Sequence, residues 1–176
     1  MNIEILLAAL PDYAKDMRLN LVSLLQSDAE QELSAKQIVA LALVSAYATQ
    51  NSLLIQLVQE QAATVLSNEE IASTKAAATI MAMNNIYYRF VHLAEDAEIQ
   101  ALPARLRMNI LANPGIDKVD FELLSLAVSA INGCGMCIKT HVKALAKTGV
   151  QKSAMQLAIR IAAVIHAVNQ AMVIES

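Results

Sequence analysis

The sequence contains few residues that interrupt helices and very few aromatic side chains. Its 176 residues include four glycines, three prolines, two phenylalanines and no tryptophan. Hydrophobic residues make up 56% of the chain, and many of them are alanine. Strand-like alternation of apolar and polar residues is not sustained anywhere along it. The composition therefore favours an all-α protein whose helices approach closely over alanine.

The chain also lacks the features of two classes of partner. A formal net charge of −3, with no basic stripe and few aromatic side chains, argues against nucleic acid. A membrane span needs about 20 predominantly apolar residues, and the longest apolar stretch, 154–173, contains Arg160 and His166. Residues 1–10 contain Glu4 but no Lys or Arg, unlike a signal peptide. We expect a soluble, cytoplasmic protein, with spare hydrophobic surface buried between subunits.

Helix signals follow one another without a linker, which predicts a single domain over residues 1–176. Two capping boxes precede apolar periodic runs: Ser34 with Gln37 before 38–47, and Ser67 with Glu70 before 71–83. Further helices are expected at 12–25, after Pro11, and at 152–174. Turns are expected at Asn113-Pro114-Gly115, Asn132-Gly133 and Thr148-Gly149, with Gly149 ending a helix.

A faint internal repeat relates the two halves of the chain. Leu-Val-Ser-Ala at 43–46 resembles Ala-Val-Ser-Ala at 127–130, an offset of 84 residues. An internal duplication and chance similarity between Ala-rich helices both remain open. Under a duplication with this offset, Cys134 corresponds to Gln50, so the first half is scaffold and the second holds the chemistry.

The only two cysteines, Cys134 and Cys137, directly follow the Asn132-Gly133 break. A C-x-x-C in a reducing compartment indicates redox or metal chemistry more often than a structural disulfide. If a helix begins after Gly133, unpaired backbone N–H groups and the helix dipole favour a thiolate there. Residues three apart share a helical face, with a Cα separation within the roughly 4.4–6.8 Å that a disulfide tolerates. The disulfide can therefore form and break without unfolding the helix.

Two further side chains can serve the cysteine pair. His141 shares the face of Cys137, four residues later, and can exchange a thiol proton. On one straight helix Glu122 would lie about 18 Å from Cys134, so it can join only if the chain turns and two helices pack side by side. We expect this hairpin, with a proton relay from Glu122 through His141 and Cys137 to Cys134. Cys134, nearest the turn, is expected to meet a partner.

Two other interpretations of the cysteines remain open. Both could be small buried hydrophobes, since free cysteine is among the most buried residues. A zinc site from Cys134, Cys137, His141 and Glu122 is conceivable, but structural zinc sites usually use two separated ligand pairs and no carboxylate. We therefore expect no metal.

At these residues the sequence resembles the AhpD alkylhydroperoxidases, within the broader carboxymuconolactone-decarboxylase-like group. The family motif is a Glu, eleven residues, Cys-x-x-Cys and a His four further on, matched by Glu122, Cys134, Cys137 and His141. Residues 81–89, 106–118 and 121–134 also look like the family. The resemblance implies an AhpD-like all-α domain with its catalytic segment at 118–149, assembled as a homotrimer.

The resemblance also implies an activity. The protein would be an antioxidant peroxidase that reduces alkyl hydroperoxides and regenerates a two-cysteine peroxiredoxin of the alkyl hydroperoxide reductase type. Electrons would come from dihydrolipoamide on a lipoylated acyltransferase, with no tightly bound cofactor. Cys137 would be the attacking thiol that becomes a sulfenic acid, and Cys134 would give a proton and then resolve it to the disulfide. Glu122 and His141 would assist proton transfer.

One residue departs from the family pattern. Family members often carry a second histidine directly before the latter cysteine, where this chain has Met136. A thioether cannot move a proton, so Met136→His is expected to speed the reaction at neutral pH. Two other functions remain open: a lactone decarboxylase, which needs no dithiol, and a non-enzymatic trimeric scaffold.

Overall fold

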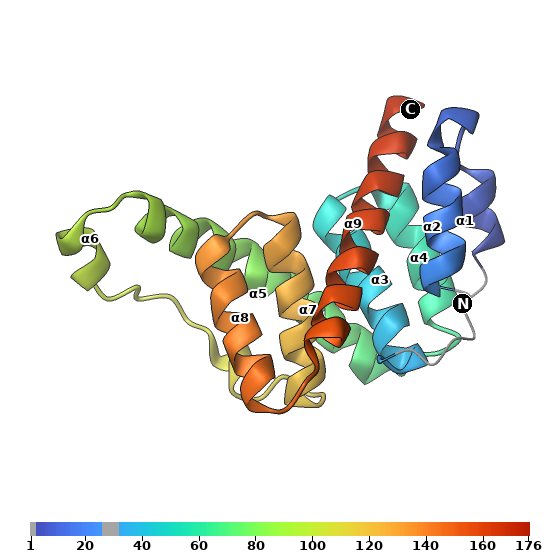
Figure 1. Ribbon diagram of the computed structural model, residues 1–176. Coiled ribbons are helices and arrows are strands. Elements are labelled where there is room, and N and C mark those ends of the chain that lie inside the picture. The colour runs from blue at the N-terminus through green and yellow to red at the C-terminus, as the bar shows by residue number, and fades with distance from the viewer. Residues whose placement is uncertain (1–2, 26–31) are drawn as a thin grey trace.

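The computed structural model describes residues 3–25 and 32–176, and every regular element in these ranges is helical, which confirms the expected all-α class. The α-helices are α1 (Glu4–Ala8), α2 (Lys15–Leu25), α3 (Ala35–Thr49), α4 (Ser52–Ala62), α5 (Asn68–Leu93), α6 (Ala97–Ala101), α7 (Lys118–Ile131), α8 (Gly135–Lys147) and α9 (Lys152–Ile174). Two short 3-10 helices are η1 (Asp12–Ala14) and η2 (Asn109–Leu111). Figure 1 shows their arrangement.

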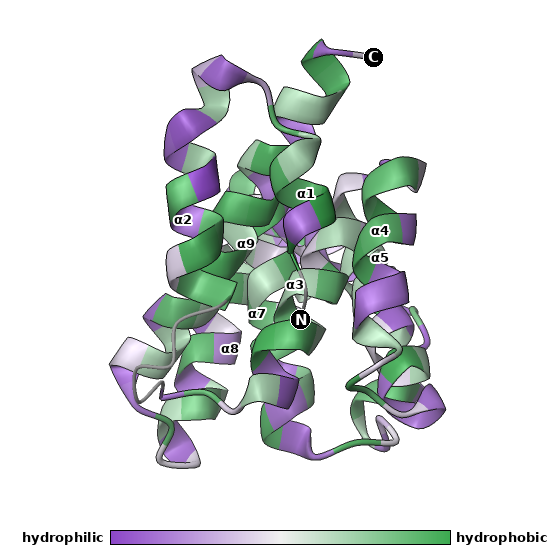
Figure 2. Ribbon diagram, turned by 90° about the vertical axis from the view of Figure 1, so that its right-hand side faces the viewer, coloured by the Kyte–Doolittle hydropathy of each residue, from purple (hydrophilic) through white to green (hydrophobic). Residues whose placement is uncertain are grey.

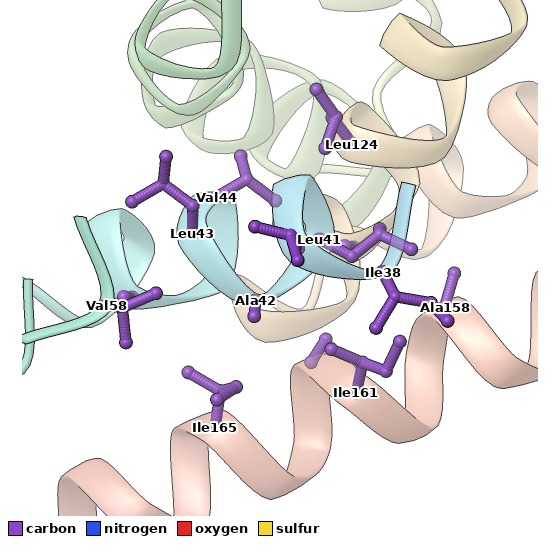
Figure 3. Close-up of a cluster of buried hydrophobic side chains, with 14 of the residues drawn as sticks. Ile38, Leu41, Ala42, Leu43, Val44, Val58, Leu124, Ala158, Ile161 and Ile165 are labelled. Carbon is purple, nitrogen blue, oxygen red and sulfur yellow. The ribbon is translucent and has the colours of Figure 1, made fainter. Parts of the chain in front are cut away.

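Helix α3 lies at the centre of the core and packs against α4, α5, α7 and α9. Its residues 41–46 are all buried. Figure 3 shows this stretch above Ile161 and Ile165 of α9, with Leu124 of α7 on another side. Small and branched aliphatic side chains fill the space between helices, as the alanine-rich composition predicted.

The helix boundaries agree with the local sequence signals. Both capping boxes are present: the Ser34 and Ser67 side chains each accept a backbone N–H three residues later, and the Gln37 and Glu70 side chains bond back. Gly149, with φ +84°, follows the C-cap residue Thr148 at the end of α8, as predicted. These contacts are short-range, so sequence spacing alone is enough to find them.

Helix α9 is long and apolar enough to cross a membrane by length and composition. It packs, however, against α2, α3 and α7, and contributes ten buried residues to the interior. Figure 2 shows the hydrophobic segments gathered where α3, α7 and α9 lie together. Its apolar character is therefore accounted for by the protein core.

The helices α3, α4 and α5 are matched in order by α7, α8 and α9. A shift of 83 residues places Gln50 on Gly133, both with positive φ, and the N-cap Asn51 on the N-cap Cys134. The first residues of α5 and α9 instead differ by 84 positions. Buried positions repeat in the same way along both hairpins, as an internal duplication would produce.

The expected uniform offset of 84 is therefore wrong around the cysteines. The second half contains one residue more than the first between the start of α8 and the start of α9. Cys134 corresponds to Asn51 rather than to Gln50. A gapless comparison could not detect this insertion, because the matching sequence identities are few.

Candidate active site

The turn between α7 and α8 places Cys134 at the start of a helix. Asn132 caps the end of α7, and Gly133 follows with φ +67°, a conformation that glycine adopts at no steric cost. The backbone N–H of Cys134 donates to the Ser129 carbonyl at 3.0 Å. Cys134 is then the N-cap of α8, and its sulfur accepts the Cys137 N–H at 3.3 Å. The predicted break and helix start are both confirmed.

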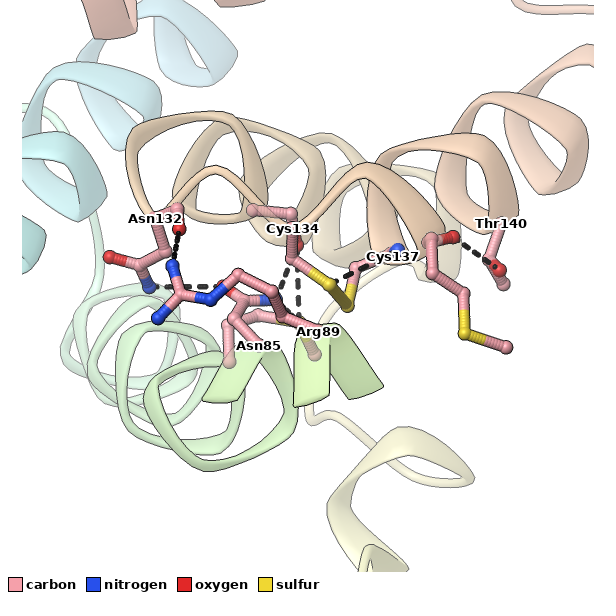
Figure 4. Close-up of a disulfide and its surroundings, with 9 residues drawn as sticks. Asn85, Arg89, Asn132, Cys134, Cys137 and Thr140 are labelled. Carbon is pink, nitrogen blue, oxygen red and sulfur yellow. Dashed lines mark hydrogen bonds between the residues drawn. A yellow bond between two sulfur atoms is a disulfide. The ribbon is translucent and has the colours of Figure 1, made fainter. Parts of the chain in front are cut away.

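Cys134 and Cys137 form a disulfide, with their Cα atoms 5.3 Å apart. In Figure 4 this disulfide lies at the start of α8, next to helix α5. Cys134 is 0% exposed and Cys137 is 7% exposed. The expectation that Cys134 meets a partner stays a prediction, and both cysteines are buried in the disulfide form. The reason is tertiary: α5 packs against both α7 and α8 and is bonded to the turn.

Glu122 and His141 face each other across the hairpin. The Nδ1 atom of His141 lies 2.7 Å from a carboxylate oxygen of Glu122, which joins α7 to α8. His141 is buried, whereas the Glu122 side chain is 36% exposed. The hairpin that the motif required is therefore confirmed, with Glu122 beside His141 and His141 one helical turn from Cys137.

Sequence reasoning missed a group of polar residues on α5 that hold the turn. The Asn85 side chain donates to the Ser129 hydroxyl at 2.9 Å and accepts from the Asn132 side chain at 3.0 Å. Arg89 donates to the Asn132 carbonyl at 2.5 Å. The only sequence signal was that residues 81–89 look like the family, which assigned no role to them.

A cavity of about 440 Å³ lies among the N-terminal turns of α3, α5 and α7, but none of the four predicted site residues lines it. Among residues 3–25 and 32–176, no group of three or more His, Cys, Asp or Glu side chains could hold a metal ion. The predicted site residues instead gather around the disulfide at the α7–α8 hairpin.

The chain is similar to known proteins over almost its whole length. The chain is 58% identical over 167 residues to alkyl hydroperoxide reductase AhpD of Coxiella burnetii (strain RSA 493 / Nine Mile phase I), covering 95% of this chain and 94% of the relative. It is 49% identical to the same-named protein of Maricaulis maris (strain MCS10) over 176 residues, covering all of both chains.

The chain belongs to the AhpD family. The carboxymuconolactone decarboxylase family also matches, over residues 97–174. That segment contains the whole α7–α8 hairpin and α9, so the AhpD motif lies inside the part that the broader group shares.

Proposed function

We propose that this AhpD-family chain is a thiol-dependent alkyl hydroperoxide reductase that cycles between a Cys134/Cys137 dithiol and the observed disulfide. The observation that carries the proposal is the disulfide at the α8 N-terminus, with the Glu122–His141 pair one turn along the same hairpin. A decarboxylase or an inert scaffold has no use for such a pair beside two cysteines that can bond.

The cycle has two chemical steps on the protein. The Cys137 thiolate attacks the terminal peroxide oxygen, which breaks the O–O bond, oxidises Cys137 to a sulfenic acid and releases the alcohol once a proton is supplied. Cys134 then attacks the Cys137 sulfur, so that the disulfide forms and the sulfenic oxygen leaves as water. Two thiols of dihydrolipoamide reduce the disulfide by exchange and become the cyclic lipoamide disulfide.

The geometry supports unequal roles for the two cysteines. Cys137 is the more exposed of the two residues and precedes His141 by one turn, so it suits attack on a small peroxide. Cys134, fully buried at the N-cap, suits proton donation and resolution. The Glu122 carboxylate fixes His141 through Nδ1, and Nε2 is then the ring nitrogen that would exchange a proton with the thiol.

The assembly and partners form a second part of the proposal. Helix α6 projects away from the other helices in Figure 1 and contains no buried residue. Large apolar side chains of α5 and the C-cap residue of α6 are exposed: Ile86, Phe90, Leu93 and Leu102. A homotrimer would cover such surface. A two-cysteine peroxiredoxin as oxidised partner, a lipoylated acyltransferase as donor and a cytoplasmic location complete the proposed function.

The test is turnover of a hydroperoxide by the full chain with dihydrolipoamide as reductant. Consumption of both in equal amounts supports the proposal, and Cys134→Ser and Cys137→Ser should each abolish it. Turnover that survives in both variants rejects the dithiol cycle, and loss of carbon dioxide from a carboxylated lactone would favour the decarboxylase. Sedimentation equilibrium checks the trimer separately.

A further inference from the structure

Asn85 lies outside the four-residue motif, yet its side chain bonds both to the last turn of α7 and to the residue that caps it. Its Nδ2 donates to Ser129 Oγ at 2.9 Å, and its Oδ1 accepts from Asn132 Nδ2 at 3.0 Å. Ser129 in turn accepts the Cys134 N–H through its carbonyl. Asn85 is 1% exposed and Ser129 is 0% exposed. A buried network whose members satisfy one another in this way rigidifies what it joins.

The first hairpin makes the same turn without this network. Asn169 of α9 corresponds to Asn85, but its Oδ1 has no hydrogen-bond partner among the described residues. Ala46 and Thr49 stand at the positions of Ser129 and Asn132, and the Thr49 hydroxyl donates to the Ala46 carbonyl of its own helix at 2.7 Å. No side chain of α9 bonds this turn among the described residues. The α3–α4 hairpin nevertheless forms, so such bonds are not required to form the hairpin.

We propose that Asn85 is a positioning residue for the dithiol. By fixing Ser129 and Asn132 it holds the backbone of Cys134 at the N-cap in both redox states, so that its sulfur stays within reach of Cys137. A thiol held near its partner has a high effective concentration, which favours disulfide formation from either the dithiol or the sulfenic acid. The role of Asn85 in catalysis rests on the proposed function, whereas its effect on the disulfide equilibrium does not.

The equilibrium between the Cys134–Cys137 disulfide and dithiothreitol, measured on the full chain, tests this directly. Reduction opens the protein disulfide and closes the reagent into its cyclic disulfide, so two electrons and two protons are exchanged. Asn85→Ala should make the protein disulfide easier to reduce, with an equilibrium shift on the order of tenfold, the size of one net hydrogen bond. A mere loss of global stability would not shift this equilibrium in the folded chain.

The matched control is Asn84→Ala, at the neighbouring position on α5. Asn84 is also buried, at 5% exposed, but its Oδ1 has no partner among the described residues. This control should lower the melting temperature but leave the disulfide equilibrium nearly unchanged. An equal shift in both variants overturns the proposal.

A second pair of variants tests the proposal if Asn85→Ala does not fold. Ser129→Ala removes only the hydroxyl that Asn85 bonds, and should shift the equilibrium about threefold in the same direction. Ser125→Ala, one turn earlier on α7, removes a buried hydroxyl with no partner among the described residues and should leave it unchanged. An unchanged equilibrium in Ser129→Ala overturns the proposal, whereas failure of peroxide turnover with these shifts intact would refute only the proposed function.

Discussion

The hairpins α3–α4 and α7–α8 share a backbone turn but differ in the side chains around it. Each passes through a residue with positive φ, Gln50 or Gly133, directly before the N-cap of the second helix. Cys137 and His141 of the second hairpin correspond to Leu54 and Val58 of the first, which are completely buried. One frame therefore serves packing in the first hairpin and redox chemistry in the second.

The same difference extends to the helix before each turn. Glu122, whose carboxylate bonds His141, corresponds to Val39, which is buried. Where the first hairpin has Val39 and Val58, the second has a carboxylate and a histidine that bond each other. We infer that stability depends more on the first hairpin and turnover on the second, and the following predictions test that division.

The largest effect on folding is expected at Leu54, which corresponds to Cys137 of the second hairpin. Leu54→Ala should lower the free energy of unfolding by about 2–5 kcal/mol, because a fully buried leucine leaves a cavity. Cys137→Ser should change it by much less while abolishing turnover. Urea unfolding of both variants, followed by circular dichroism, measures the difference. The division fails if Cys137→Ser destabilises the chain as much as Leu54→Ala.

The next effect concerns the pair across the second hairpin. Glu122→Gln keeps the shape of the side chain but removes the carboxylate that holds Nδ1 of His141. Peroxide turnover should fall on the order of 100-fold, as for loss of a positioned proton-transfer group. Asp120→Asn, which neutralises another carboxylate on α7, is the control for net charge. Equal rates in the two variants would show that only overall charge matters.

A smaller effect is expected at the two turn residues. Gln50 adopts φ +60°, which costs a residue with a Cβ roughly 1–2 kcal/mol, so Gln50→Gly should stabilise the chain by up to about 1 kcal/mol. Gly133→Ala should destabilise it by about 1 kcal/mol through backbone strain alone, because no atom lies within 4 Å of an added Cβ. Thermal unfolding can measure both changes in stability. The prediction fails unless Gln50→Gly raises the melting temperature and Gly133→Ala lowers it.

The last effect appears only at alkaline pH and belongs to the first hairpin. Burial raises the pKa of Tyr47 to about 12, and the corresponding residue of the second hairpin is Ala130. The unfolded chain loses the phenol proton from about pH 10 while the folded chain keeps it, so stability falls between pH 10 and 12. Tyr47→Phe should make that fall shallower in urea titrations. If stability falls equally with pH in the original chain and in Tyr47→Phe, Tyr47 does not contribute to the fall.

Local sequence signals predicted the ends of the helices well, whereas contacts between residues far apart in the sequence could not be predicted. The Ser34 and Ser67 caps depend on residues three positions apart. The Glu122–His141 contact was predictable because the Asn132-Gly133 break dictates which helices pair. The bond between Asn85 and Ser129 joins residues 44 apart, and no spacing rule connects them. The bonds that hold the turn before Cys134 were missed for the same reason, since they come from α5.

The shortness of the cystine loop bears on how the fold responds to its own redox state. A disulfide stabilises a protein largely by restricting the unfolded chain, and this restriction grows with the length of the loop that it closes. Here the sulfurs are three residues apart, within the first turn of one helix, so the loop is among the shortest possible. Oxidation therefore restricts the unfolded chain less than a disulfide between distant residues would. Each catalytic cycle accordingly changes the stability of the whole molecule less than making and breaking a long-range disulfide would.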